Sequence, residues 1–441
     1  MRLRRDRHAR IGVARPAGTR GAAALSRGAA FTGHTFDSLR LHRNYRLYFT
    51  GQSVSQIGTW LQGAAQSWLV LGLTHSAIAV GLVSFWQFVP FTLFGLFGGA
   101  LSDRLDPRRT LVASQSAMGV LALGLAAVAY LHVTDIALVY AIAGARGIVM
   151  IFNSPSLQRL MIRLVGREEL ANAISLNSGV NNATRVVGPG LAGVLIAAAG
   201  VGMCFLLNAV SYLAVVVALL MMRPQEFKPI RGAARAPMLE SVREGLAYAV
   251  KVPRVWVPLL MLTIISTTGI NFSVLLPVLA AQTLHSGPEV FGLISSVFGL
   301  GAVLGALIAA TISRATWGLL LASAAGFSLF QLVLAPQHSL ALVLVLLVAV
   351  GICYTVYTSM TNAMVQLAAP DQLQGRVAGL YSYVFLGTSP LGALFAGGLT
   401  QAGGTGLTFG SAGVIGLVVS AAALLGLRRG RAARPGDASL L

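Results

Sequence analysis

Two arginines stand inside long apolar runs of the sequence, where an ionised group has no water around it. Arg146 and Arg185 each lie near the middle of such a run. A charged side chain at the centre of a membrane helix costs about 2.5–3.5 kcal/mol on insertion scales, so each guanidinium is expected to face a partner or a water-filled cavity. Arg146 is predicted to contact a neutral or anionic substrate, and Arg185 is a further intramembrane charge. The alternative is that both bond to helix carbonyls for structural reasons.

Carboxylates and histidines are missing from the centres of these apolar runs. All seven histidines lie near the amino terminus or between runs. Proton antiport commonly uses an intramembrane acid whose pKa changes as access alternates. Because none is present, proton coupling does not follow from the residues themselves. Asp135 and Glu289, each at the end of a run, are second-choice proton carriers.

Polar side chains recur at helical spacing in three of the runs. At about 100° per residue, the polar residues within 52–66, 263–271 and 354–361 each fall on one side of a helix. Such stripes predict a central cavity, although hydrogen bonding between helices, worth about 0.6 kcal/mol per pair, is an alternative. Together with Arg146, the residues predicted to bind substrate are Gln52, Gln56, Thr59, Gln66, Thr267, Asn271, Tyr354, Tyr357 and Thr358.

The elements that must position these residues are membrane-spanning helices. The chain of 441 residues is 56% hydrophobic and 10% charged, whereas a soluble domain is about 25% charged. Apolar runs near the roughly 20 residues that cross a bilayer recur along it. They predict an all-α membrane protein with twelve transmembrane helices, at about 47–73, 77–101, 110–131, 136–157, 171–198, 203–222, 256–280, 290–312, 317–335, 340–361, 379–402 and 408–427.

The positive charges predict the orientation of these helices. The formal net charge is +19, and all of the 32 Lys and Arg except Arg146 and Arg185 lie before the first run, in alternate breaks or after the last run. This asymmetry follows the positive-inside rule, which predicts that both termini are cytoplasmic. Topology and anionic membrane lipids then account for the charge, so nucleic acid is not expected as a partner.

The runs divide into two similar halves. The segment 164–170, Leu-Val-Gly-Arg-Glu-Glu-Leu, precedes a run with a central Gly-Pro, and 367–373, Leu-Ala-Ala-Pro-Asp-Gln-Leu, precedes one with Ser-Pro. A parallel repeat of six helices is typical of transporters that bind substrate between the halves. The predicted division is a disordered basic tail at 1–40, six-helix bundles at 41–222 and 255–427 related by pseudo-symmetry, a cytoplasmic linker at 223–254 and a tail at 428–441.

Two motifs resemble those of the major facilitator superfamily. Residues 99–109, Gly-Ala-Leu-Ser-Asp-Arg-Leu-Asp-Pro-Arg-Arg, are similar to its Gly-x-x-x-Asp-Arg-x-Gly-x-Arg-Arg signature, with Asp106 at the second glycine. Residues 188–193, Gly-Pro-Gly-Leu-Ala-Gly, are similar to its antiporter motif, although plain helix packing is an alternative. The resemblance implies a conformational switch that comprises Gly99, Asp103, Arg104, Arg108, Arg109, Gly188 and Pro189.

Shorter motifs resemble the drug and siderophore exporters of that superfamily, a branch that includes enterobactin exporters and macrolide efflux proteins. They are Arg-Asn-Tyr-Arg at 43–46, Gly-Thr-Trp at 58–60 and Ala-Asn-Ala at 171–173. The resemblance implies a monomeric secondary-active exporter of small amphiphilic neutral or anionic compounds in a bacterial inner membrane, working by alternating access with the proton as coupling ion. An importer, a lysophospholipid flippase and a transport-inactive scaffold remain as alternatives.

Nothing in the sequence predicts an enzyme. It contains no nucleotide-binding glycine loop, no metal cluster and no pairing of a nucleophile with a base. Cys204 and Cys353 lie in separate apolar runs and match neither a metal site nor a disulfide framework. Catalytic residues, metal ions and cofactors are therefore not expected.

Overall fold

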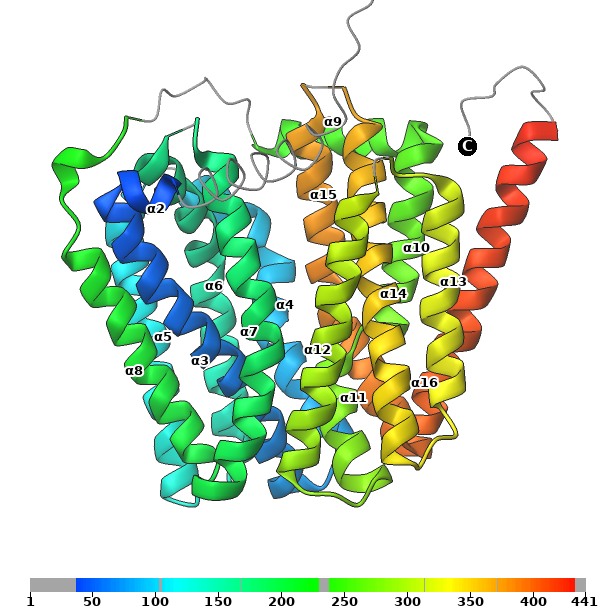
Figure 1. Ribbon diagram of the computed structural model, residues 1–441, viewed down its shortest axis with the longest axis horizontal. Helices are drawn as coiled ribbons and strands as arrows, with labels where there is room; N and C mark the ends of the chain where they lie inside the picture. Colours follow the sequence, from blue (N-terminus) through cyan, green and yellow to red (C-terminus); the bar gives the residue numbers. More distant parts are fainter. Residues whose placement is uncertain are drawn as a thin grey trace, which may run out of the picture.

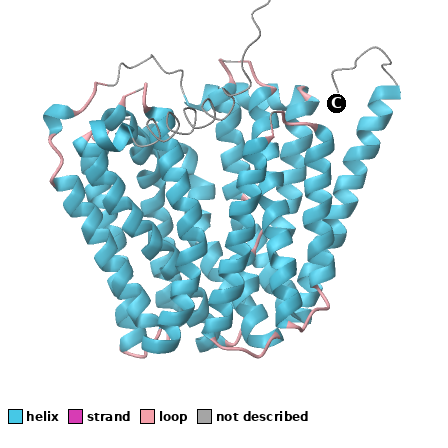
Figure 2. Ribbon diagram, in the orientation of Figure 1, coloured by secondary structure: helices cyan, strands magenta, loops and turns pink. Residues whose placement is uncertain are grey.

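The computed structural model describes residues 37–102, 105–166, 168–229, 238–312, 314–370 and 372–432. Over these residues the chain forms helices and loops without a strand (Figure 2), which confirms the predicted all-α fold. Residues 1–36 of the predicted amino-terminal tail and 433–441 of the carboxyl-terminal tail lie outside the described residues.

The helices form two bundles that stand side by side (Figure 1). The first bundle comprises α3 (Arg43–Thr74), α4 (Ala77–Ser102), α5 (Pro107–Tyr130), α6 (Ile136–Val165), α7 (Leu170–Ala199) and α8 (Val201–Leu220). The second comprises α10 (Pro253–Gly269), which continues into α11 (Phe272–Val278) and the π-helix η2 (Leu279–Thr283), then α12 (Pro288–Thr311), α13 (Trp317–Leu334), α14 (Leu340–Leu367), α15 (Gln374–Gly387) and α16 (Ser389–Ala432).

Ten helical stretches of the described residues are long and apolar enough to cross a membrane. Helix α3, which carries four glutamines, is not among them. The stretch Gln374–Arg429 counts once, although Gly403 and Gly404 break α16 with non-helical backbone angles. Adding α3 and dividing α16 at this break gives the twelve predicted crossings.

One predicted crossing, at 256–280, is interrupted. Helix α10 ends at Gly269 and α11 begins at Phe272, so Ile270 and Asn271 are not helical. The amide of Gln331 on α13 donates to the carbonyl of Gly269 at 3.2 Å. Non-helical backbone at membrane depth is tolerated where protein groups satisfy it, and Gln331 meets that need here.

The helix ends gather on two opposite faces. The basic face, at the top in Figure 1, carries the loops and helix ends with Arg108, Arg163, Arg223 and Arg376. The histidine face carries the loops with His75, His132, His285 and His338. The first three of these histidines adopt φ of 51°, 51° and 48°, a left-handed region that histidine tolerates better than most residues. They therefore close tight turns between helices.

Two elements lie on the basic face outside the bundles. Helix α9 (Met238–Lys251) falls in the predicted linker, and its Tyr248 hydroxyl donates to the carbonyl of Ala368 at 2.6 Å. Helix α2 (Asp37–Leu41) corrects the prediction that residues up to 40 form a disordered tail. It is held because Ser38 donates to the Asn172 side chain at 2.6 Å, next to an ion pair of His42 and Glu169 at 3.0 Å.

The bundles meet closely near the histidine face, in a seam formed by Gly81, Gly193, Gly292, Ala393 and Gln401. A Cβ atom on Gly292 of α12 would lie 2.8 Å from the Cα atom of Gly193 on α7, so the two helix backbones touch. On the other side of the seam, the Ser76 hydroxyl donates to the Gln401 side chain at 3.0 Å. Glycine is required at the crossing of α7 and α12 because no side chain fits there.

Candidate substrate cavity

A cavity of about 410 Å³ lies between the two bundles. Helices α3, α4, α6 and α7 line it from the first bundle, and α11, α12 and α14 with Ile270 line it from the second. Its volume falls in the range of about 300–1,000 Å³ that is typical of small-molecule sites. Both intramembrane arginines, Arg146 and Arg185, are among its lining residues.

Arg146 reaches the cavity from the middle of α6. Its side chain is 7% exposed, and its Nε atom is buried without a hydrogen-bond partner among the described residues. The neighbouring Gly147 lies against the backbone of α4 at Gln87, where a side chain would not fit. This close contact of α6 with α4 fixes the position of Arg146. A buried guanidinium with a free donor is suited to a ligand that brings an acceptor.

Arg185 on α7 is oriented by an aromatic ring. Its guanidinium carbon lies 5.3 Å from the centre of the Trp60 ring on α3, within the range of a cation–π interaction. Its buried Nε atom also lacks a partner among the described residues. Gly188 leaves room for the indole, because a Cβ atom there would lie 2.5 Å from the Cβ atom of Trp60.

The second bundle contributes an aromatic wall, formed by Phe272, Phe291, Phe298 and Tyr354. The ring centres of Phe272 and Phe298 are 4.1 Å apart, and those of Phe298 and Tyr354 are 5.8 Å apart. Two turns from Phe298 along α12, Phe291 stacks on Trp68 of the first bundle, with the ring centres 5.4 Å apart. The aromatic wall thus adds apolar surface to the cavity that the two arginines also line.

The charges that line the cavity are all positive. Among the described residues, its lining includes Arg146 and Arg185 but no Asp, Glu, Lys or His. In a region of low dielectric constant, two uncompensated cations attract an anion more strongly than they would in water. The remaining lining residues are Thr59, Trp60, Gly63, Ala64, Gln66, Ser67, Val83, Ser84, Gln87, Phe88, Pro189, Ile270, Phe272, Ser273, Leu276, Phe291, Ser295, Phe298 and Tyr354.

Four of the ten predicted substrate-binding residues line this cavity: Thr59, Gln66, Arg146 and Tyr354. The amide nitrogen of Gln66 is buried without a partner among the described residues, so it is a further free donor. The other six, which are Gln52, Gln56, Thr267, Asn271, Tyr357 and Thr358, are not lining residues.

Contacts with neighbouring helices explain why most of these six residues do not line the cavity. The break after Gly269 places Asn271 against Gly392 of α16, and its amide donates to the carbonyl of Thr267 at 2.9 Å. Tyr357 is fully buried, and the hydroxyl of Thr358 bonds back to the carbonyl of Tyr354 at 3.0 Å. Gln52 and Gln56 lie on α3 between the cavity and the basic face.

The main residues missed by the sequence analysis are those of the aromatic wall. Phe291, Ser295 and Phe298 follow one another at intervals of four and three residues along α12. That spacing places them on one helix side, so a search for aromatic as well as polar stripes would have found them. Phe272 gave no such signal, because the break at Ile270 and Asn271 sets its direction.

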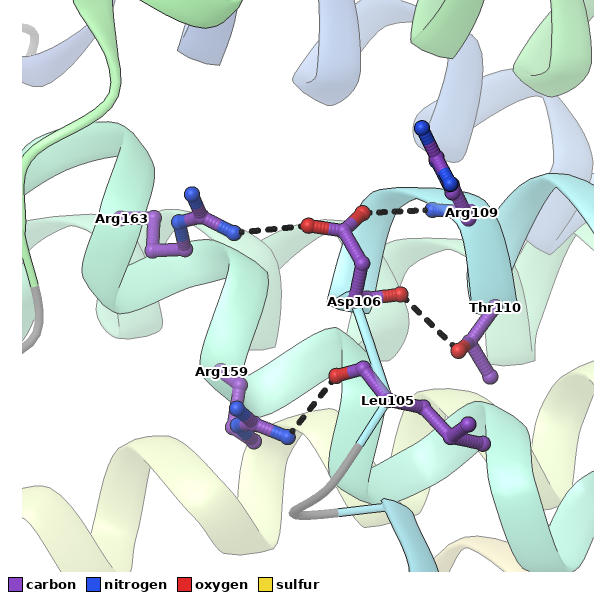
Figure 3. Close-up of polar contacts among 6 residues, drawn as sticks. All are labelled: Leu105, Asp106, Arg109, Thr110, Arg159 and Arg163. Atoms are coloured by element: carbon purple, nitrogen blue, oxygen red, sulfur yellow. Dashed lines mark hydrogen bonds and ion pairs between the residues drawn. The ribbon is translucent and has the colours of Figure 1, made fainter.

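The loop of the superfamily signature is built around Asp106 (Figure 3). Asp106 caps the amino terminus of α5 by accepting from the main-chain N–H of Arg109 at 3.0 Å, and its other oxygen accepts from Arg163 at 3.1 Å. Its φ of −68° is ordinary for a helix cap, so the loop does not need glycine at this position. Partial burial alone would raise the pKa of Asp106, but the bonds from Arg109 and Arg163 outweigh it and hold the pKa below its usual value.

The predicted conformational switch is only partly described. Gly99 lies in the last turns of α4, whereas Asp103 and Arg104 lie outside the described residues. Arg108 donates to the carbonyls of Leu219 and Leu220 at 2.8 and 2.9 Å, which holds the end of α8 within the first bundle. Arg109 is exposed at the start of α5, and Gly188 and Pro189 are buried on α7.

Residues 35–434 match the family described as transmembrane secretion effector, a branch of the major facilitator superfamily. The chain belongs to this family. The predicted resemblance is thereby confirmed, and the protein is a multi-pass membrane transporter of small molecules rather than an enzyme.

Several curated relatives are similar to this secretion effector over most of its length. It is 27% identical to the multidrug efflux pump Tap of Mycolicibacterium fortuitum, over 80% of this chain and 88% of that one. It is 27% identical to the enterobactin exporter EntS of Shigella boydii, over 82% and 86%. A match to the staphyloferrin A transporter of Staphylococcus aureus is 26% identical over 60% and 66%.

Solved structures of other transporters share the fold. The nucleoside transporter NupG superposes with a TM-score of 0.69 at 11% identity, over 87% of this chain and 98% of that one. A bacterial homologue of the lysosomal transporter Spinster, in an inward-facing conformation, gives a TM-score of 0.64 at 14% identity. At these identities the likeness establishes the arrangement of helices alone.

Proposed function

We propose that this secretion effector exports small amphiphilic compounds, neutral or anionic, of the drug-like or siderophore-like kind. The observation that carries the proposal is the pair of cavity arginines, Arg146 and Arg185. Their buried Nε atoms lack partners among the described residues, and the aromatic wall lines the same cavity. A ligand with an acidic or carbonyl-rich end and an apolar body satisfies both surfaces at once. The names of the relatives, which include a multidrug efflux pump and an enterobactin exporter, support export.

Transport is proposed to follow alternating access in a bacterial inner membrane. The basic face is assigned to the cytoplasm because positive loops are retained there. The seam at Gly193 and Gly292 closes the bundles near the histidine face, and rocking of the bundles would open it. The predicted switch residues of the signature loop and of α7 would control that motion. The cavity is complete within one chain, so the transporter is proposed to act as a monomer.

The proton is the proposed coupling ion, and Glu289 is the better placed of the two candidate carriers. The Asp135 carboxylate caps α6 by accepting from the main-chain N–H of Ala137 at 2.9 Å, so it already has a structural role. Glu289 is exposed in the first turn of α12, one turn from Gly292 in the seam. Replacing Glu289 by Gln should leave substrate binding intact and abolish the dependence of export on a pH gradient. Unchanged gradient dependence would remove Glu289 from the mechanism.

The substrate proposal is tested with the full chain in proteoliposomes. Three fluorescent amphiphiles of matched size, one carboxylate, one neutral and one cationic, are supplied on the side of the basic face. The carboxylate and neutral compounds should be exported, and Arg146→Gln should slow the carboxylate about tenfold or more while leaving the neutral compound nearly unchanged. Arg429→Gln, which removes an exposed arginine from α16, is the matched control. Export of the cation alone, unaffected by Arg146→Gln, would overturn the proposal.

The same proteoliposomes distinguish an exporter from the three alternatives. Under an imposed pH gradient, an importer would move its substrate in the opposite direction. A lysophospholipid flippase would move labelled lysolipid. A scaffold would not change conformation. Cysteines at Ser76 and Gln401, whose side chains bond at 3.0 Å, should crosslink in a substrate-dependent fraction if the seam opens.

A further inference from the structure

We propose that the second bundle holds the phosphate group of an anionic phospholipid in a pocket on the basic face. The phosphate pocket is about 90 Å³ in volume and lies between the ends of α10, α13 and α14. It shares no lining residue with the substrate cavity and does not depend on the proposed function. Its lining residues are Arg254, Ala315, Thr316, Trp317, Met364, Leu367 and Ala368.

The side chains of the phosphate pocket offer unused hydrogen-bond donors. Trp317 is 3% exposed, and its indole Nε1 atom is buried without a partner among the described residues. An indole N–H can only donate, so this group needs an acceptor that the described chain does not supply. Arg254, in the first turn of α10, is half-buried and adds a guanidinium that has no ion pair among the described residues.

The start of α13 adds the electrostatics of a helix amino terminus. Thr316 is the cap residue of this 18-residue helix, and its hydroxyl oxygen accepts from the main-chain N–H of Leu319 at 3.4 Å. The hydroxyl hydrogen stays free to donate, and the first main-chain N–H groups of the helix have no helical partner. Helix amino termini bind phosphate for this reason, and the buried indole of Trp317 lies at the same end.

The size and composition of the phosphate pocket select a single oxyanion. A volume of about 90 Å³ is about three times the share of one water molecule in the liquid, enough for a phosphate group and too small for a drug-sized ligand. Among the described residues, no carboxylate lines it. The carbonyl of Ala368, which could compete for donors, already accepts the hydroxyl of Tyr248 at 2.6 Å.

The first bundle has its own carboxylate at the position that corresponds to the phosphate pocket. Asp106 caps α5 after the loop that follows α4, just as Thr316 caps α13 after the loop that follows α12. Asp106 supplies its own anion, which pairs with Arg163 at 3.1 Å. In the second bundle the cap is a neutral threonine, so the described chain supplies no anion there and the donors are left for an external one.

Apolar surface beside the phosphate pocket indicates that the phosphate belongs to a lipid. Leu367 lines the pocket and is 73% exposed. On α10, Trp256 and Leu260 are 43% and 50% exposed within two turns of Arg254. Exposed apolar side chains on a membrane-spanning helix face acyl chains, and basic pockets between such helices bind anionic head groups.

The test uses the full-length protein, purified in detergent and stripped of lipid, with binding measured by native mass spectrometry. The probes are dioctanoyl phosphatidylglycerol, dioctanoylglycerol, which lacks the phosphate, and inorganic phosphate. Phosphatidylglycerol should bind, and dioctanoylglycerol and inorganic phosphate should bind at least about tenfold more weakly. Arg254→Gln should weaken phosphatidylglycerol binding about tenfold or more, as expected for the loss of a charged hydrogen bond.

The matched control is Arg314→Gln, which removes an exposed arginine two residues from Thr316 that does not line the pocket. It should change phosphatidylglycerol binding less than about twofold. Equal losses in both variants would overturn the proposal in favour of diffuse surface charge, as would unchanged binding in Arg254→Gln. Inorganic phosphate that binds as tightly as the lipid would overturn the lipid source. If Arg254→Gln fails to fold, Thr316→Val and Trp317→Phe, which keep the charge, should each weaken binding, and unchanged binding in both would overturn the proposal.

Discussion

The two bundles face the same cavity with different chemistry. The first bundle supplies two guanidiniums, those of Arg146 and Arg185, and the free amide of Gln66. The second bundle supplies the aromatic wall around Phe298 and Tyr354. The helix arrangement repeats between the halves, but the residues that contact the cavity do not. An amphiphile is therefore expected to bind with its polar end toward the first bundle and its apolar body toward the second.

The basic face shows a second difference between the halves. Asp106 gives the cap of α5 a charge that Arg163 neutralises, whereas Thr316 gives the cap of α13 no charge. At this cap the first bundle thus pairs its own carboxylate with an arginine, whereas its cavity arginines have no ion pair among the described residues. In the second bundle, the arginine near the corresponding cap, Arg254, has no ion pair among the described residues, and the wall that faces the cavity is uncharged.

Replacing both cavity arginines should remove the preference for anionic over neutral substrates that the first bundle is proposed to provide. For Arg146→Gln with Arg185→Gln, kcat/KM for an anionic substrate should fall by about 100-fold or more, because each lost charged hydrogen bond is worth about 1.5–3 kcal/mol. Export of a matched neutral compound should stay within about threefold. Thermal stability should not fall, because two cations at membrane depth are removed, Arg146 buried and Arg185 half-buried. An equal loss for both compounds with a lower melting temperature would show that the arginines are structural.

At the seam both halves contribute a glycine, and Gly193 and Gly292 are in contact. Gly292→Ala should destabilise the protein by about 1–3 kcal/mol, because a Cβ atom there meets backbone atoms that cannot move aside. Gly398→Ala is the matched control, since a Cβ atom at that position meets no atom within 4 Å. Thermal unfolding in detergent measures both. Equal melting temperatures would mean that the seam is looser than described.

Removing one ring of the aromatic wall tests whether the second bundle binds the apolar body of the substrate. Phe298→Ala should lower affinity for anionic and neutral amphiphiles alike by about 2–10-fold, because an aromatic contact is worth about 0.5–1.5 kcal/mol and does not depend on substrate charge. Binding is measured by titration of the purified transporter. Phe94→Ala, which removes an exposed ring from α4, should have no effect on affinity. A loss confined to anions would place their charged end against the second bundle instead.

The smallest effect is expected at Asp106. Asp106→Asn keeps the helix cap, since asparagine caps as well as aspartate, and loses only the partly exposed pair with Arg163. The cost near pH 7 should be below about 1 kcal/mol. Because the folded state lowers the pKa of Asp106, this stabilisation is present above the usual carboxyl pKa and is lost as pH falls through the lowered value. The difference in melting temperature between the two proteins should therefore be constant from pH 5 to 8 and vanish only below about pH 4.

The sequence analysis located the cavity arginines but not the wall opposite them. Arg146 and Arg185 stood out because an ionised group in an apolar run is costly wherever the fold places it. Thr267 and Asn271 shared a helix side in the sequence, yet the helix breaks at Ile270 and Asn271, and the Asn271 side chain lies against Gly392 of α16. Asp106 replaces a glycine of the superfamily signature, but the structure shows that it forms an ordinary helix cap at that position.

By itself, the sequence determined the number of helices and the division of charge between the two faces, because a bilayer requires apolar segments of a set length and retains positive loops on one side. It also determined that two cations lie at membrane depth. Only the tertiary structure decided which polar residues face the cavity and which face another helix. Helical spacing gives a direction for each side chain, but what lies in that direction depends on how the bundles pack, as Thr59 and Gln66 on the cavity and Asn271 against Gly392 show.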